Sequence, residues 1–156
     1  MKNTKRLAIF SLFLVVALTV NSFFVLAADM TYEQIFASSV VMKLASSVAY
    51  ANGEQKAIDE NNGVVPQLKA DRTFVPLRFV SENFGADVSY NDVDESVSIT
   101  SGDSKILLTV GSADMTVNGE VVTLDAAPFV ENDRTFVPIR AITESLGKKV
   151  FWHDSG

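Results

Sequence analysis

The chain carries few side chains that could perform catalysis. Of its 156 residues one, His153, is a histidine, and none is a cysteine. A copper centre needs several imidazoles and a serine triad needs a histidine base, so a single histidine in a predicted turn supports neither chemistry. The lack of cysteine also excludes disulfide bonds and thiolate metal sites. We therefore expect no catalytic residue, no cofactor and no bound metal, with His153 as an exposed turn residue.

Paired carboxylates remain the formal route to catalysis. Glu82 and Glu144 could act as the acid and the base of a glycosidase. Each of them, however, follows an arginine by four residues, Arg78 in one case and Arg140 in the other. Side chains at this spacing are neighbours on a helix, where an exposed ion pair contributes about 0.3 to 0.5 kcal/mol. We interpret both glutamates as partners in intrahelical ion pairs, and the protein as not an enzyme.

Two other groups of side chains could bind a ligand. Three carboxylates in one predicted turn could attract calcium, but the glycine spacing and distal glutamate of a calcium loop are missing. Several aromatic residues could form a platform for sugar stacking, although their alternation with polar neighbours favours packing in the core. We expect a solvated turn for Asp92, Asp94 and Glu95, and core packing for Phe74, Phe84, Tyr90, Phe136 and Trp152.

One eight-residue block occurs twice. Residues 71–78 read DRTFVPLR, and residues 133–140, 62 positions later, read DRTFVPIR. Downstream, the same shift relates Glu82 to Glu144, Gly85 to Gly147, Val88 to Val150 and Tyr90 to Trp152. Upstream, a shift of 66 relates residues 40–44 to 106–110, Asn52-Gly53 to Asn118-Gly119, and Ile58-Asp59 to Leu124-Asp125. The chain is therefore predicted to hold a first repeat at 39–104 and a second repeat at 105–156.

Each repeat has its own signals for strands and for a helix. Asn52-Gly53 and Asn118-Gly119 are strong hairpin turns, because both residue types tolerate positive φ. Pro76 and Pro138 each favour an extended residue before them and a helix after them. A glycine then supplies the left-handed cap of each helix. The predicted fold class is α+β, built of tandem small units, each a twisted antiparallel β-sheet packed around one short α-helix.

The end of each repeat is predicted to be a hairpin. In the first repeat the hairpin strands are residues 86–90 and 96–100, and residues 101–104 form a link short enough to pack the repeats together. In the second repeat the hairpin begins at Val150–Trp152, and its last strand would fall beyond Gly156. We therefore expect the second repeat to lack its closing strand, which leaves an open sheet edge available for self-association.

Two arginines, Arg72 and Arg134, recur at the start of the same predicted strand beside an acidic residue. We hypothesise that each makes a structural ion pair or a hydrogen bond to loop carbonyls near the strand–helix junction. The predicted structural motif comprises Arg72, Pro76, Arg78, Glu82 and Gly85 in the first repeat, and Arg134, Pro138, Arg140, Glu144 and Gly147 in the second.

These residues resemble the copper amine oxidase N-terminal-like, or stalk, domain family. The resemblance rests on the Asn-Gly hairpin, the Arg-Thr-Phe-Val-Pro-x-Arg block, the following glutamate and glycine, and a Val-x-aromatic-x-Asp run; it covers nearly everything after about Val40. It implies exported proteins with one helix and a twisted antiparallel sheet per unit, often in tandem copies. It implies no catalysis, because the family takes its name from an accessory stalk that is remote from the copper and quinone of the oxidase.

The N-terminus has the pattern of a secretion signal. Lys2, Lys5 and Arg6 precede an almost unbroken apolar run, and short residues precede a predicted cut after Ala27. Cleavage would leave residues 28–38 as a lead-in to the repeats; an uncleaved membrane anchor is the alternative. The mature part would carry a net charge of about −9, which argues against nucleic-acid binding.

Three functions stay open from sequence. We favour a non-catalytic structural or protein-interaction module of the bacterial cell envelope. A binding module for cell-wall polysaccharide or peptide is one alternative, and an accessory fragment of a larger secreted enzyme is another. The expected location is secreted or associated with the envelope, without membrane insertion after signal cleavage. The expected partners are cell-wall or other envelope components, and not nucleic acid.

Overall fold

Short antiparallel strands dominate the chain. A computed structural model describes residues 31–60 and 63–153, so the predicted secretion signal lies outside the described residues. From Tyr32 onward the described residues form one compact unit, which begins with helix α2 (Tyr32–Ala37). Within the described residues no helix is long and apolar enough to cross a lipid bilayer.

The first sheet has the order β1-β2-β3 and belongs entirely to the first repeat. Its strands are β1 (Val40–Met42), β2 (Val48–Ala51) and β3 (Glu54–Ala57). Asn52 and Gly53 join β2 to β3 with φ values of 55° and 81°. Both turn residues therefore adopt the left-handed conformation of a two-residue hairpin, as the sequence predicts.

A second sheet has the order β11-β12-β5-β4 and joins the two repeats. Its strands are β4 (Gln67–Lys69), β5 (Arg72–Pro76), β11 (Phe129–Glu131) and β12 (Arg134–Pro138). β5 and β12 are antiparallel, with Val75 opposite Val137 at the centre of the register. These two valines share one position in the repeat, so the register relates the repeats by an approximate two-fold rotation.

The third sheet has the order β10-β9-β8-β7-β6 and is also shared. The first repeat contributes β6 (Asp87–Asn91) and β7 (Ser96–Ser101). The second contributes β8 (Ser104–Thr109), β9 (Asp114–Val117) and β10 (Glu120–Thr123). Ser101 pairs with Ser104, so the predicted link is the turn of a β7–β8 hairpin.

The prediction that each unit has a sheet of its own is therefore wrong, although the antiparallel sheets and short helices are as expected. Strands of both repeats form two of the three sheets. The physical reason is size, because a unit of about sixty residues buries a modest fraction of its surface and gains stability by sharing a core. Sharing strands lets each repeat complete the core of the other.

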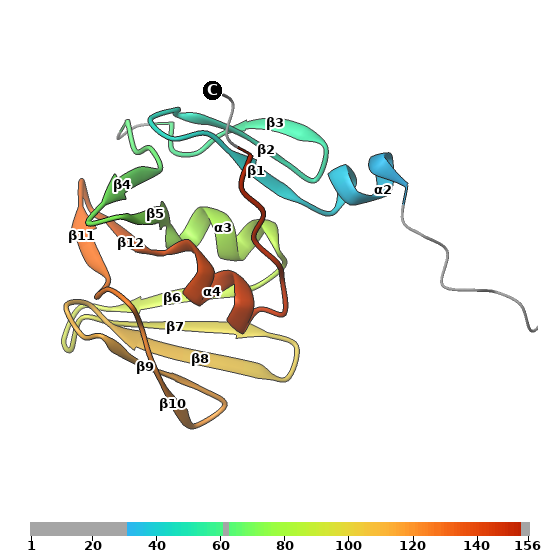
Figure 1. The fold of residues 1–156 in the computed structure, drawn as a ribbon. Coiled ribbons are helices and arrows are strands. Elements are labelled where there is room, and N and C mark those ends of the chain that lie inside the picture. Colours follow the sequence, from blue (N-terminus) through green and yellow to red (C-terminus); the bar gives the residue numbers. More distant parts are fainter. Residues whose placement is uncertain (1–30, 61–62, 154–156) are drawn as a thin grey trace, which may run out of the picture. The chain divides into compact units, whose positions relative to one another are not determined.

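Two helices, α3 (Leu77–Asn83) and α4 (Ile139–Ser145), follow Pro76 and Pro138 directly. Gly85 and Gly147, at φ values of 81° and 69°, end these helices as predicted. Figure 1 shows both helices between the three-stranded and the five-stranded sheet. Their apolar faces pack in the main core, which contains Val75, Leu77, Val80, Val97, Ile99, Ile106, Leu108, Met115, Val137 and Ile142.

The strand predicted at Val150–Trp152 is not formed. Residues 148–153 have no regular secondary structure, although Asp87–Asn91 at the same repeat position forms β6. β6 is held by β7, and a strand without such a neighbour leaves its backbone groups unpaired. Residues 148–153 thus form no strand at this hairpin position, and self-association through an edge of the second repeat stays a prediction.

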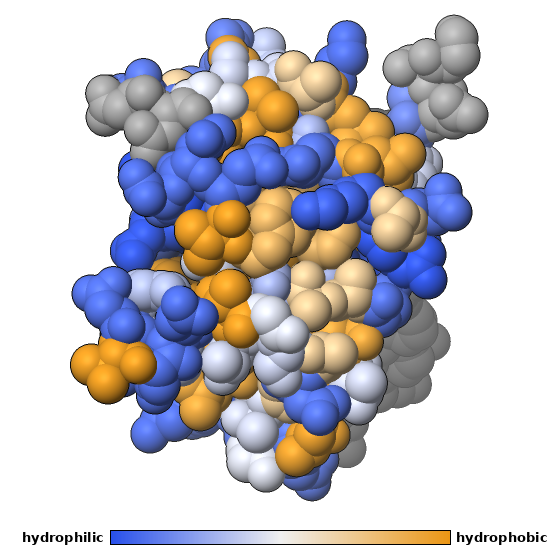
Figure 2. Space-filling model, turned by 90° about the vertical axis from the view of Figure 1, so that its left-hand side faces the viewer, coloured by the Kyte–Doolittle hydropathy of each residue, from blue (hydrophilic) through white to orange (hydrophobic). Residues whose placement is uncertain are grey.

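The face containing β4 and β11 exposes apolar side chains. Leu68 of β4 is 62% exposed and Val130 of β11 is 47% exposed. Figure 2 shows this face, where apolar surface lies between hydrophilic bands. Side chains of the two edge strands also meet, since Gln67 Nε2 donates to Glu131 Oε1 at 3.0 Å and Lys69 Nζ lies 4.0 Å from the centroid of Phe129. The sheet is therefore curled.

Candidate functional site

Two reciprocal ion pairs connect the repeats. Arg72 of the first repeat pairs through Nε with Asp125 of the second. Arg134 of the second repeat pairs through Nε with Asp59 of the first, at 2.5 Å. Each arginine also donates from Nη1 to the carbonyl of the preceding aspartate, at 3.1 Å for Arg72 and 2.9 Å for Arg134. Both interactions that the sequence suggested for these arginines are thus present together.

The carboxylates in these pairs do not belong to Asp71 and Asp133, the acidic residues that directly precede the two arginines. Asp59 and Asp125 occupy equivalent positions, 66 residues apart, directly after Ile58 and Leu124. The repeat shift shows this equivalence, but no local sequence signal gives the aspartates a role. The missing step was the two-fold relation between the repeats, which places each aspartate beside the arginine of the other copy.

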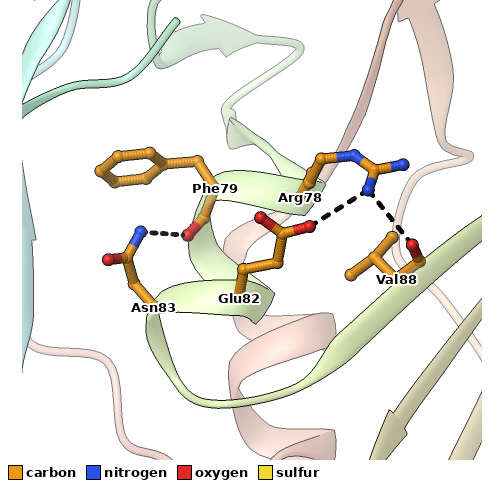
Figure 3. A network of polar contacts seen from close by, with 5 residues as sticks. All are labelled: Arg78, Phe79, Glu82, Asn83 and Val88. Atoms are coloured by element: carbon orange, nitrogen blue, oxygen red, sulfur yellow. Dashed lines mark hydrogen bonds and ion pairs between the residues drawn. The ribbon is translucent and has the colours of Figure 1, made fainter.

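Arg78 clamps α3 to the neighbouring strand (Figure 3). Its Nη1 donates to Glu82 Oε1 at 3.1 Å and to the backbone carbonyl of Val88, in β6, at 3.2 Å. The ion pair between Arg78 and Glu82 therefore forms as predicted. The sequence did not predict the second contact, which ties the helix to the closing hairpin of its own repeat.

The equivalent residues in the second repeat behave differently. Within the described part of the chain, the side chains of Arg140 and Glu144 make neither an ion pair nor a hydrogen bond. The predicted pair is therefore wrong for this repeat. Val150, which corresponds to Val88, lies outside any strand. Arg140 therefore has no strand at the position where Arg78 binds β6.

A polar group on α3 holds the β2–β3 hairpin. Asn52 Nδ2 donates to the carbonyl of Asn83 at 3.0 Å, and Lys56 Nζ donates to Asn83 Oδ1 at 3.2 Å. Asn83 Nδ2 in turn donates to the carbonyl of Phe79 at 2.8 Å, as Figure 3 shows. The end of the helix is therefore a junction for the first sheet.

A cleft of about 470 Å³ lies beside α3, β6 and the β11–β12 hairpin, and four of its charged side chains are engaged in ion pairs. Arg78 with Glu82 and Arg134 with Asp59 account for two ion pairs at its wall. Glu144 lines a different groove, beside Met115 and Val122. Glu82 and Glu144 do not share a cleft, so the structure does not assemble the carboxylate pair of a glycosidase.

The acidic turn between β6 and β7 is stabilised by hydrogen bonds from its backbone amides to its own side chains. Asn91 Oδ1 accepts from the amide of Val93 at 3.0 Å, and Asp94 Oδ1 accepts from the amide of Ser96 at 3.2 Å. The described residues contain no group of three side chains able to hold a metal ion.

Desolvation, followed by the charges of Glu95, Asp92 and Asp94, raises the pKa of Tyr90 above its ordinary value of 10.0.

The aromatic residues divide into core and surface. Phe74 and Phe136 are 3% and 1% exposed, and the ring of Phe129 stacks on Phe136 with 5.2 Å between centroids. Phe84 is partly buried against the main core. Tyr90 and Trp152 are 39% and 56% exposed, so their predicted place in the core is wrong. Tyr90 lies in β6, at the edge of the five-stranded sheet, and Trp152 lies outside any strand. His153 is exposed.

The sequence matches a known protein family. The model of the copper amine oxidase N-terminal domain matches residues 36–92 and again residues 61–156. The two matched segments overlap and together run from 36 to 156, as expected for tandem copies. No curated protein matches the chain.

Proposed function

The chain belongs to the copper amine oxidase N-terminal domain family, and we propose that it is a non-catalytic, stalk-like module of exported bacterial proteins. In this role the paired repeats would space or dock components of the cell envelope. The family model supports the stalk-like character, and the geometry of the charged residues supports the lack of catalysis.

The observation that carries the proposal is how the recurring charged residues are used. Arg72, Arg134 and Arg78 are committed to Asp125, Asp59 and Glu82. Catalytic acids and bases need to reach a substrate, whereas these groups bind other parts of the same chain. Their arrangement therefore fits a scaffold.

Export is the part of the proposal that the N-terminal sequence supports. We expect the full chain, expressed in a Gram-positive host, to appear in the medium or cell wall with Ala28 as its first residue. Intact mass spectrometry would locate the cut. The matched control is Ala27→Tyr, which places a large side chain before the cut and should retain the precursor. Retention of the full-length chain in the membrane by the natural sequence would contradict export as a cleaved protein.

Binding to cell-wall material is a second candidate function, favoured by the exposed aromatic residues near the C-terminus. Phe151 is 85% exposed and Trp152 is 56% exposed. Aromatic faces can stack on sugar rings. Sedimentation of the protein with purified cell wall tests this candidate, with Trp152→Ala as the variant and Val93→Ala, at a residue that is 93% exposed, as the control. Equal sedimentation of both variants would exclude this aromatic surface.

A further inference from the structure

The outer edge of β1 has no strand partner among the described residues. β1 pairs with β2 alone, at the edge of the three-stranded sheet. In the second repeat the strand at the same position, β8, pairs on both sides, with β9 and with β7. β1 therefore presents unpaired backbone amides and carbonyls where β8 is covered.

The two-fold relation between the repeats shows what would occupy this edge. It exchanges β5 with β12 about Val75 and Val137, and it places β1 where β8 lies. The same rotation carries β7, and β6 beyond it, onto the outer edge of β1. By this relation the outer edge of β1 corresponds to the edge of β8 that pairs with the β6–β7 hairpin.

The apolar side chains of β1 are less buried than those at the same positions of β8. Ile106 and Leu108 of β8 are 1% and 2% exposed. Their counterparts in β1, Val40 and Met42, are only half-buried. β7 supplies the difference, because Val97 faces Leu108 and Ile99 faces Ile106.

The clamp residues show the same difference. Arg78 holds the Val88 carbonyl of β6, whereas Arg140 has no side-chain hydrogen bond among the described residues. Val150–Trp152 corresponds to part of β6, and the segment that follows α4 runs toward the three-stranded sheet (Figure 1). Residues 150–152 thus correspond in sequence to the first strand of a closing hairpin but form no strand.

We propose that the outer edge of β1 is an acceptor for a β-hairpin of the β6–β7 type, whose inner strand adds antiparallel to β1. The register of β7 on β8 sets the side chains: apolar residues opposite Met42 and Val40, and a small polar residue opposite Val41. Backbone hydrogen bonds supply the affinity, and the alternating apolar side chains supply the specificity. The inference goes beyond the proposed function, because it depends on strand geometry and not on export.

The test extends the chain after Gly156 by a copy of Glu95–Ser101, the sequence of the β7 region. Residues 149–156 together with the extension then reproduce a complete closing hairpin. We expect the β1 amides that point away from β2 to exchange with deuterium at least about tenfold more slowly, and the midpoint of thermal unfolding to rise. The matched control is an extension of equal length in which the copies of Val97 and Ile99 are replaced by aspartate.

Two further measurements separate the possible outcomes. Arg140→Ala should lower the midpoint of the extended chain and leave that of the original chain unchanged, because only the hairpin gives Arg140 a carbonyl to bind. Light scattering gives the oligomeric state of the original chain. Unchanged exchange in β1, equal protection by the aspartate extension, or a dimer of the original chain with protected β1 amides would each overturn the proposal. The last result would show that a second copy occupies the edge. None of these results bears on secretion or on catalysis.

Discussion

The cross-repeat ion pairs make a quantitative prediction, because the two pairs share chemistry but differ in burial. The Arg134–Asp59 pair has side chains that are 36% and 11% exposed. The Arg72–Asp125 pair has side chains that are 45% and 50% exposed. Solvent screens an exposed pair, whereas hydrogen bonds to charged groups that are partly removed from water contribute more.

A double-mutant cycle measures each coupling. We expect Arg134→Ala, Asp59→Ala and the double variant to give a coupling energy of about 1 to 2 kcal/mol. The same cycle on Arg72 and Asp125 should give below about 1 kcal/mol, as for exposed pairs. Urea unfolding followed by the fluorescence of the one tryptophan, Trp152, or by circular dichroism supplies the free energies.

Two results would refute this reasoning. A coupling for Arg72 with Asp125 that equals or exceeds the other would show that burial does not set the strength of these pairs. Unchanged thermal unfolding of Arg134→Lys would also count against it, because a lysine cannot keep both the Asp59 contact through Nε and the Asp133 carbonyl contact through Nη1. Sodium chloride should weaken the Arg72 pair more than the Arg134 pair, since screening acts on exposed charges.

Three other outcomes follow from single positions. Phe136→Ala should cost about 3 to 5 kcal/mol of unfolding free energy by leaving a cavity in the core, whereas Phe151→Ala, at a side chain that is 85% exposed, should leave the stability nearly unchanged. Arg78→Ala should cost about 1 kcal/mol because it releases Glu82 and the β6 carbonyl, and Arg140→Ala should cost almost nothing; urea unfolding tests both pairs of variants. In a titration at 295 nm, Tyr90 should ionise above its ordinary pKa of 10.0, and Tyr90→Phe should remove that step. Because the folded state raises this pKa, the contribution of Tyr90 to stability is complete below pH 10.0 and is lost as the pH rises through the raised value.

Local features of the fold were predictable because short segments determine them. Asn118-Gly119 and its counterpart form turns because each pair accepts positive φ, a property of two residues alone. Pro76 fixes its own φ and restricts the residue before it, so the change from β5 to α3 could be placed to within one residue. These signals are the same in isolation and in the folded chain.

The pairing of strands and of charges was not predictable in this way. The sequence of residues 101–104 predicts only a link, whereas Gly102 and Asp103 form the turn that joins the repeats into one sheet. Val150–Trp152 has the side chains of a strand but is not one, because strand formation depends on a neighbouring strand more than on intrinsic preference. Asp59 and Asp125 acquire their partners through the two-fold relation, which no local pattern contains.

The two-fold relation also distinguishes this pair of repeats from an open repeat array. In a solenoid each repeat contacts the next by the same translation, and the array can grow indefinitely. Here the rotation about Val75 and Val137 returns the second repeat to the first, so that Arg134 binds Asp59 while Arg72 binds Asp125. A third repeat would find these partners already taken. A pair of repeats is therefore the closed unit of this fold, and the outer edge of β1 is the place where that closure is incomplete.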